Sequence, residues 1–187
     1  DVTVLDAMDP FYDIDIKRHT LDTHQRIAEE NGLLYDFVEG DVRDETLVAD
    51  LVDEVDYVYH QAAKAGVRPS VEAPREYHAV NVDGTLNILD AARETEIERI
   101  VVASSSSVYG GREEYLPFSE TDPTLPVSPY GASKLSAERY ACAYHEVYDI
   151  PTVATRYFTV YGPRMRPNMA ISNFVSRCMN GSPPVVY

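Results

Sequence analysis

The sequence predicts an α/β fold built on a doubly wound parallel sheet, and three observations support this fold class. Short apolar segments of strand character alternate with longer amphipathic segments along the 187 residues. The spacing between successive strand-like segments leaves room for a crossover helix, as right-handed β-α-β units require. We find no repeat, low-complexity tract or linker. One domain with a parallel sheet covered on both faces is therefore expected.

The first half of the chain is expected to hold three strands and two helices. Residues 2–6, Val-Thr-Val-Leu-Asp, form a short apolar run typical of a buried strand. The polar stretch 15–31 is helix-like, and Asn31-Gly32 is a helix-ending signal. The other expected elements are a strand within 33–41, an amphipathic helix over 44–54 and a strand within 55–63.

The second half is expected to continue the alternation. A long helix fits Pro74 to Glu96, because apolar residues recur there at helical spacing, and a strand follows at 99–105. Ser128 is a good N-cap, and Pro129 suits the first position of a helix that runs to about Tyr148. The last expected strand covers 151–158.

Composition excludes several classes of function. Thirty-one acidic residues against 16 basic residues give a formal net charge of −15, which disfavours a nucleic-acid partner. No apolar run approaches the roughly 18 residues that a membrane span needs, so no membrane partner is expected. Neither the two cysteines nor the five histidines have metal-ligand spacing, and no metal is expected. A reduced, cytoplasmic protein is the default, and its acidity resembles that of proteins from salt-loaded cytoplasms.

Candidate functional residues gather at the predicted strand ends. In open parallel sheets, ligands bind beyond the carboxyl ends of the strands. Asp6, Asp41, Ala62, Ser105 and Phe158 all fall at or just past such an end. The pattern indicates one ligand site along this edge of the sheet.

The glycine-rich turn that opens a dinucleotide-binding fold is absent from the sequence. Neither G-x-G-x-x-G nor G-x-x-G-x-x-G occurs, yet Asp6 lies where the acidic residue that binds the adenosine ribose would be expected, at the end of a second strand. We therefore expect about 25–30 residues to precede Asp1 in the complete protein, from the length of a β-α-β unit. Residues 1–187 are then a fragment of a dinucleotide-binding domain.

The stretch Ser-Pro-Tyr-Gly-Ala-Ser-Lys at 128–134 carries the sharpest chemical signal. Tyr130 and Lys134 stand at i and i+4, on one face of the expected helix. A free phenol ionises near pH 10, and an ammonium group one turn away favours the phenolate, so the pair suits a general base. The serine-rich strand end at 104–107 offers four candidates for a hydroxyl donor that would complete this arrangement. With 14 tyrosines in the chain, the spacing alone is weak evidence, and an ordinary exposed helix start is the alternative.

Six blocks give the chain a resemblance to a known family. They read GDVRD, HQAAKAGVRPS, NVDGTLNILDAA, SSSSVYG, SPYGASK and RYFTVYGPRMRPNMA. In this order and spacing they resemble the extended short-chain dehydrogenase/reductases that act on nucleotide sugars, and are most similar to the UDP-glucose and UDP-glucuronate 4-epimerases. The resemblance implies a Rossmann-like fold, NAD as cofactor, a UDP-sugar substrate and a homodimer. It also implies that residues from about 160 to 187 begin a substrate-binding lobe.

The resemblance implies a role for each matching residue. Tyr130 would be the catalytic base, Lys134 would hold the nicotinamide ribose, and Ser105 would bridge substrate and phenol. The other implied cofactor contacts are Asp6, Asp41, Val42, Ala62, Ala63, Ala65, Asn81, Tyr157 and Phe158. The implied substrate contacts are Ser106, Ser107, Thr159 and Arg166.

Three alternatives remain open. A 4,6-dehydratase of this family usually has an Asp-Glu pair after the serine strand end, where this sequence has Val108-Tyr109. A UDP-glucuronate decarboxylase would share the oxidation at C4. A non-catalytic nucleotide-binding module would keep the fold alone, which the intact Ser105, Tyr130 and Lys134 argue against.

Overall fold

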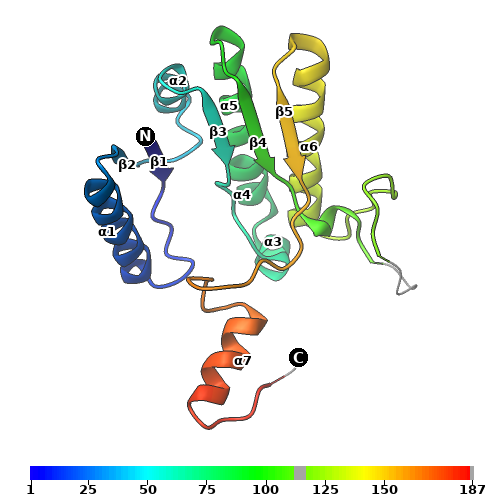
Figure 1. Cartoon of the computed structure of the whole chain (residues 1–187). Coiled ribbons are helices and arrows are strands. Elements are labelled where there is room, and N and C mark those ends of the chain that lie inside the picture. The colour runs from blue at the N-terminus through cyan, green and yellow to red at the C-terminus, as the bar shows by residue number, and fades with distance from the viewer. Residues whose placement is uncertain (112–116, 186–187) are drawn as a thin grey trace. The chain divides into compact units, whose positions relative to one another are not determined.

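The computed structural model describes residues 1–111 and 117–185, and the chain divides into two compact units. Unit 1 combines Asp1–Glu39 with Thr159–Tyr187, and unit 2 is the continuous segment Gly40–Phe158. Each unit has its own parallel strands and its own helices (Figure 1). All three candidate catalytic residues, Ser105, Tyr130 and Lys134, belong to unit 2.

Unit 1 contains two parallel strands joined by a helix. β1 (Val2–Asp6) pairs along its length with β2 (Tyr35–Glu39), and α1 (Ile14–Asn31) connects them. Asp13 caps α1 by accepting a hydrogen bond from the Asp15 amide at 3.0 Å. Gly32 ends α1 at φ 66°, a left-handed conformation that favours glycine, so the predicted stop signal is confirmed. A further helix, α7 (Ala170–Met179), was not predicted.

Unit 2 is built on three parallel strands in the order β3-β4-β5. Their bounds are Tyr57–His60, Arg99–Ala103 and Thr152–Thr155. Ile100 and Val102 of the central strand are buried, and α5 (Gly84–Ala91) and α6 (Pro129–Tyr148) pack against the same core. Figure 1 shows these helices lying behind the three strands. The core of unit 2 therefore sits between one face of the sheet and these helices.

The other face of this sheet is exposed in unit 2. Tyr59, Val101 and Val153 stand opposite one another in the parallel register and share that face. Tyr59 is 72% exposed and Val153 is 42% exposed. Within the described part of unit 2, helices cover one face only, whereas two covered faces were expected.

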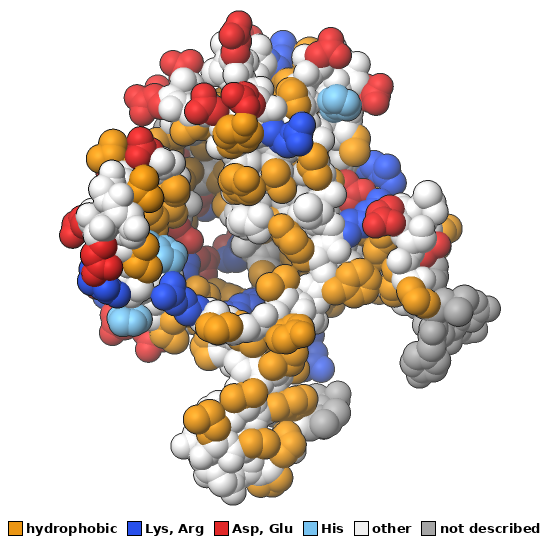
Figure 2. Space-filling view, viewed as in Figure 1, with side chains coloured by type: hydrophobic (Ala, Val, Ile, Leu, Met, Phe, Trp, Pro, Cys, Tyr) orange, Lys and Arg blue, Asp and Glu red, His pale blue; other side chains and the backbone are white. Residues whose placement is uncertain are grey.

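The remaining elements of unit 2 are short. They are α2 (Glu45–Asp53), α3 (Val67–Glu72), α4 (Pro74–His78), the π-helical η1 (Ala79–Asp83), and the 3-10 helices η2 (Ala92–Glu94) and η3 (Ser106–Val108). Figure 2 shows acidic side chains gathered at the end of unit 2 where its strands begin. The candidate catalytic residues come from the other end of the strands.

The α/β fold class with parallel strands is confirmed, with three corrections of detail. The five predicted strands exist, most of them shorter than predicted, and the described strands pair as two plus three instead of as one sheet. The helix predicted from Pro74 to Glu96 is confirmed as a helical segment from Pro74 to Glu94, but it is not one regular α-helix, because α4, the π-helical η1, α5 and the 3-10 helix η2 follow one another in it. The wide turn η1 contains Asn81, whose side chain bonds to the Lys64 backbone and to Ser133. The spacing of apolar residues in the sequence could not predict this turn, because it carries no information about polar contacts between distant segments.

Candidate active site

The first turn of α6 holds Tyr130 in a defined frame. The Ser128 side chain accepts a hydrogen bond from the Gly131 amide at 3.0 Å, and Pro129 opens the helix, as the sequence predicts. The Tyr130 amide donates to the Ser70 hydroxyl at 3.1 Å. Its ring packs edge to face against buried Tyr77, at 6.3 Å between centroids. The backbone and the ring of Tyr130 are thus both held by α3 and α4.

Lys134 lies one turn further along α6 and is buried. Its residue is 5% exposed, and burial lowers the pKa of its ammonium group from 10.5 to about 8. Among the residues that the structure describes, no side chain or carbonyl forms a hydrogen bond or ion pair with this ammonium. At neutral pH the group remains mostly protonated, so α6 presents a buried cation beside Tyr130.

A buried histidine faces the same region. His60, at the end of β3, is 4% exposed, and its Nε2 lies 2.8 Å from the Thr85 hydroxyl. The Thr85 hydroxyl donates its proton to the Asn81 carbonyl at 2.7 Å, so His60 Nε2 must donate to Thr85. Burial first, and then the charge of Lys134, lower the pKa of His60 to about 3. His60 is therefore a neutral, packed side chain.

The serine-rich strand end meets the start of α6 through a glycine. A Cβ at Gly131 would lie 2.6 Å from the backbone oxygen of Ser107, closer than side-chain carbon atoms approach such an oxygen. The absence of a side chain at this position lets the first turn of α6 rest on Ser107. Tyr130 is the residue before this contact, and the predicted approach of its phenol to the serines stays a prediction.

Ser105 is placed to donate a hydrogen bond. Its side chain is buried, caps η3, and accepts from the Ser107 amide at 3.1 Å. Within residues 1–111 and 117–185, no acceptor for its hydroxyl proton is found. The Ser106 amide donates to the Tyr157 carbonyl at 2.8 Å, which ties the serine segment to the chain after β5.

Asn81 connects several of these elements. Its amide nitrogen donates to the Ser133 hydroxyl at 2.9 Å, and Ser133 donates to the Tyr130 carbonyl at 2.8 Å. Its amide oxygen accepts from the Lys64 amide at 2.7 Å. Asn81 is buried, so in this structure it links η1 to the loop after β3 and to α6. A direct contact with the cofactor, implied by the resemblance, stays a prediction.

The other predicted cofactor residues of unit 2 lie in loops after strands. Asp41 pairs with Arg43 through two side-chain hydrogen bonds of 2.9 and 2.6 Å, and these bonds hold the pKa of Asp41 below its usual value despite partial burial. Val42 is a core residue against Gly84, so only its backbone can face a ligand. Ala62, Ala63 and Ala65 follow β3, and Tyr157 and Phe158 follow β5 with exposed rings.

Three predicted residues belong to unit 1. Asp6 accepts hydrogen bonds from Lys17 Nζ at 2.9 Å and from the Met8 amide at 2.7 Å. Thr159 is exposed, and the guanidinium of Arg166 lies over the Phe11 ring at 5.1 Å from its centroid. Their predicted roles, in the ribose and substrate contacts, stay predictions.

Sequence reasoning missed a buried ion pair behind the serine segment. Glu138 of α6 is 3% exposed and pairs with Arg156, the residue after β5, at 2.7 Å. Ser104 donates to the same carboxylate at 2.7 Å. The signal available in the sequence was the spacing of Glu138, four residues after Lys134 and eight after Tyr130.

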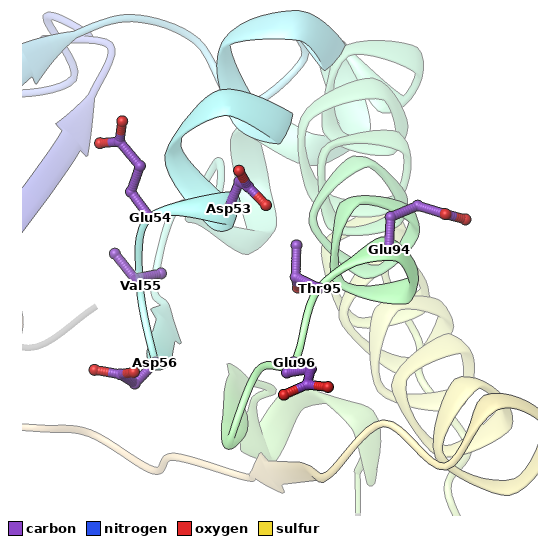
Figure 3. A pocket seen from close by; sticks show the side chains of 7 residues that line it. All are labelled: Asp53, Glu54, Val55, Asp56, Glu94, Thr95 and Glu96. Atoms are coloured by element: carbon purple, nitrogen blue, oxygen red, sulfur yellow. The ribbon is translucent and has the colours of Figure 1, made fainter.

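A separate pocket of about 380 Å³ lies where β3 and β4 begin. Figure 3 shows its lining, which comes from the end of α2, the segment before β3 and the connection from η2 to β4. The lining residues are Asp53, Glu54, Val55, Asp56, Glu94, Thr95 and Glu96. Five carboxylates would repel an anionic nucleotide, and the pocket is at the opposite end of the strands from Ser105. It is not part of the candidate active site.

The parallel α/β frame, with a Tyr-x-x-x-Lys pair on the helix after β4, defines the class of short-chain dehydrogenase/reductases. The sequence profile of the NAD dependent epimerase/dehydratase family matches residues 12–187, and the chain belongs to this family. None of the described helices has the length and apolar character of a membrane span.

Relatives and solved structures agree with this assignment. A probable UDP-glucuronate 4-epimerase of Rhizobium meliloti (strain 1021) is 36% identical over 189 residues, covering 100% of this chain and 54% of the relative. A mutant UDP-glucuronic acid 4-epimerase of Bacillus cereus, solved with UDP-4-deoxy-4-fluoro-glucuronic acid and NAD, matches with TM-score 0.87 and 30% identity, over 99% of this chain and 57% of that one. A dTDP-glucose 4,6-dehydratase of Streptomyces venezuelae, solved with NAD, matches with TM-score 0.81 and 31% identity, over 96% and 52%. The chain spans about half the length of the curated relatives that it matches.

NAD is the cofactor of this family, and the residues of unit 2 fit it. A buried ammonium with no partner among the described residues is costly unless a ligand supplies one. Ribose hydroxyls are suitable acceptors for Lys134. The exposed aromatic rings of Tyr157 and Phe158 are chemically suited to flank a planar ring.

Proposed function

We propose that the complete protein inverts the configuration at C4 of a UDP-hexose through a transient 4-keto sugar. The observation that carries this proposal is the buried ammonium of Lys134, which has no partner in the described part of the chain and lies one turn from Tyr130 on a helix that rests on Ser107. The similarity to UDP-glucuronate 4-epimerases over the full length of the chain supports it.

In the proposed chemistry, Tyr130 and Ser105 transfer protons, and Lys134 and the strand-end residues bind the cofactor. Tyr130, as phenolate favoured by Lys134, takes the proton of the sugar 4-hydroxyl. Ser105 donates its free hydroxyl proton to the sugar oxygen or to the phenolate. NAD, when bound, supplies the acceptor and then the donor for the hydrogen at C4. Lys134 and residues at or after the strand ends would bind and orient NAD. The proposed cofactor contacts besides Lys134 are Asp6, Asp41, Val42, Ala62, Ala63, Ala65, Asn81, Tyr157 and Phe158.

The proposed substrate is UDP-glucuronate ahead of UDP-glucose. Ser106, Ser107 and Thr159 would offer neutral hydroxyls to the sugar carboxylate, and Arg166 would bind the diphosphate. Hydroxyls can hold a carboxylate by charge-assisted hydrogen bonds without locking the ring, which must turn over after oxidation. The net charge of the chain is −15, which disfavours the binding of an anionic substrate. The proposed contacts of Arg166 and of the hydroxyl groups would therefore contribute more to substrate binding.

The test is product analysis on the complete protein with both sugars. UDP-glucuronate should be converted to its C4 epimer with kcat/KM above that for UDP-glucose. Tyr130→Phe should lower kcat by about 10²- to 10⁴-fold and leave NAD bound, because it removes a proton acceptor only. Tyr140→Phe, at an exposed position on the same helix, is the matched control and should behave as wild type. Near-normal turnover by Tyr130→Phe would end the proposed mechanism.

A 4,6-dehydratase is the second candidate, favoured by the match to the Streptomyces enzyme. At the position of the expected Asp-Glu pair, Val108 and Tyr109 are buried and supply no acid. A decarboxylase would release CO₂ from UDP-glucuronate, and a non-catalytic module would convert neither sugar. The same product analysis separates these outcomes.

We also propose the larger context of the chain. Residues from about 160 to 187 would begin a substrate-binding lobe, which the division of the chain at Thr159 supports. The complete protein would act in the cytoplasm as a homodimer.

A further inference from the structure

The ion pair of Glu138 and Arg156 uses nearly all of its bonding capacity in a buried position. Arg156 Nη2 donates to Glu138 Oε1 at 2.7 Å, and Nε donates to Oε2 at 3.0 Å. The hydroxyl of Ser104 donates to Oε2 at 2.7 Å. Both carboxylate oxygens are therefore occupied, in the fork geometry that only arginine provides.

The free end of the guanidinium reaches two further segments. Arg156 Nη1 donates to the Tyr109 hydroxyl at 2.9 Å and to the Glu120 carbonyl at 2.9 Å. The Arg156 guanidinium also lies 4.8 Å from the Tyr109 ring centroid, and Tyr109 stacks on Phe118 at 4.7 Å. One arginine thus joins the end of β5, the residue after η3 and the loop before α6.

The segments joined in this way carry the candidate catalytic residues. Ser104 precedes Ser105, and Arg156 precedes Tyr157 and Phe158. Glu138 lies on α6 at i+8 from Tyr130 and i+4 from Lys134, so it shares a helix face with both. None of the three network residues contacts the Tyr130 phenol or the Lys134 ammonium in the described structure, so the network acts on position.

The charges of the pair are stable over the working range of pH. Burial alone would raise the pKa of Glu138, but the hydrogen bonds from Arg156 and Ser104 together lower it below its usual value. The carboxylate accepts with both oxygens and has no proton to donate. The network therefore has one arrangement of donors and acceptors.

We propose that Glu138 and Arg156, with Ser104, are positioning residues that set the serine strand end against Tyr130 and Lys134 for the reaction. The inference rests on the proposed function. The ion pair would act on the reaction by placing Ser105, in addition to any contribution that it makes to the stability of the fold.

A double-mutant cycle between Ser104 and Ser105 tests this directly. Ser104→Ala removes one hydrogen bond and leaves the ion pair, so the complete protein should fold. We expect kcat for the UDP-sugar to fall about 10-fold while KM and NAD affinity change less than about 3-fold, since small displacements of a reacting group are costly. In the Ser105→Ala background, Ser104→Ala should cost less than about 2-fold, because its effect passes through Ser105. An equal loss in both backgrounds, or no loss in either, overturns the proposal.

A second variant separates geometry from charge. Arg156→Lys keeps the positive charge but cannot form the two-pronged contact, so we expect kcat to fall about 10- to 100-fold with KM nearly unchanged. Arg139→Lys, at an exposed neighbouring position on α6, is the matched control and should retain wild-type kcat. If the Arg156→Lys protein retains wild-type kcat, the positive charge alone is sufficient and the proposed positioning role is wrong.

Hydrogen exchange distinguishes this inference from the proposed function. The peptide containing residues 104–110 should exchange faster in Ser104→Ala and Arg156→Lys than in wild type, while α1 stays unchanged. If the wild-type protein converts no UDP-sugar, the proposed function fails, and faster exchange at 104–110 still supports the positioning of this segment. Unchanged exchange there overturns the positioning itself.

Discussion

At the scale of single residues, the candidate site is defined by buried polar groups. Lys134 and His60 both lie in the interior of unit 2, and burial lowers the pKa of each. A protein under selection for stability alone would place apolar side chains at such positions. The unfavourable free energy of burying Lys134 and His60 indicates that these side chains bind a ligand or hold a fixed geometry. This free energy can be measured.

Lys134→Met should stabilise the ligand-free protein and abolish its function. Because the folded pKa of about 8 lies below 10.5, the burial cost is fully present below pH 8 and is relieved as pH rises towards 10.5. Removal of the charge should raise the free energy of unfolding at pH 7 by on the order of 3 kcal/mol. NAD affinity and kcat should both fall, because the side chain has two roles. Urea unfolding and NAD titration measure these effects.

The matched control for this prediction is Lys17→Met. Lys17 is paired with Asp6 at 2.9 Å, so the loss of its charge should bring no comparable stabilisation. A destabilised Lys134→Met protein would show that the ammonium has a favourable partner in the ligand-free state. Loss of rate without loss of NAD affinity would remove the proposed ribose contact.

His60 should make the protein sensitive to mild acid. The folded pKa of about 3 lies below the ordinary value of 6.5, so the unfolded chain binds the proton first and stability falls as pH drops below 6.5. From pH 6.5 to pH 5 the contribution of His60 is about 2 kcal/mol, at about 1.4 kcal/mol per pH unit. In His60→Gln, the difference in free energy of unfolding between pH 7 and pH 5 should shrink by that amount. Chemical denaturation at both pH values measures it. His19→Gln, exposed on α1, should keep the wild-type difference, and an unchanged difference in His60→Gln would contradict the argument.

At the scale of elements, the site depends on how closely α6 approaches the end of β4. The approach is possible because Gly131 has no side chain, and the Ser107 backbone occupies the space that a Cβ would need. The Glu138–Arg156 network holds the other end of the same contact. Helix α6 is thus held against the strand ends at two points, Gly131 and Glu138. Lys134 lies between these two points along the helix, and Tyr130 directly precedes the first.

Gly131→Ala should therefore disturb both stability and catalysis. The new methyl group would meet the Ser107 carbonyl at 2.6 Å and the Pro126 Cβ at 3.1 Å, so α6 or the serine segment must shift. We expect a loss of about 1–3 kcal/mol in the free energy of unfolding and a fall in kcat larger than the change in KM. Thermal unfolding and steady-state kinetics of the complete protein check it. Gly111→Ala is the control, because no atom of the described residues lies within 4 Å of a Cβ there. Equal behaviour of the two variants would show that the contact is not needed.

At the scale of the whole molecule, NAD binding is expected to depend on a segment that does not occur among the 187 residues. The glycine-rich turn, whose backbone amides cradle a pyrophosphate at a helix N-terminus, does not occur in the sequence. Residues 1–187 alone should bind NAD weakly, with a Kd well above micromolar, although Asp6, Asp41 and Lys134 are present. Calorimetric titration of NAD into residues 1–187 and into the complete protein tests this. Micromolar binding by residues 1–187 would show that the pyrophosphate is held in another way.

The sequence by itself determined the alternation of the five strands with the main helices, the helix-ending signal at Gly32, the cap at Ser128, and the i, i+4 spacing of Tyr130 and Lys134, because caps and such spacing depend on neighbours in the chain. It also sufficed for the family, since the motif blocks are local. Only the tertiary structure decided that the helix predicted from Pro74 contains a π-helical turn around Asn81, that Lys134 is buried without a described partner, and that Glu138 meets Arg156. Each of these depends on residues far apart in the sequence, such as Asn81 and Ser133, which are 52 positions apart. Local periodicity carries no information about such contacts, because their energy appears only when distant segments pack together and exclude water.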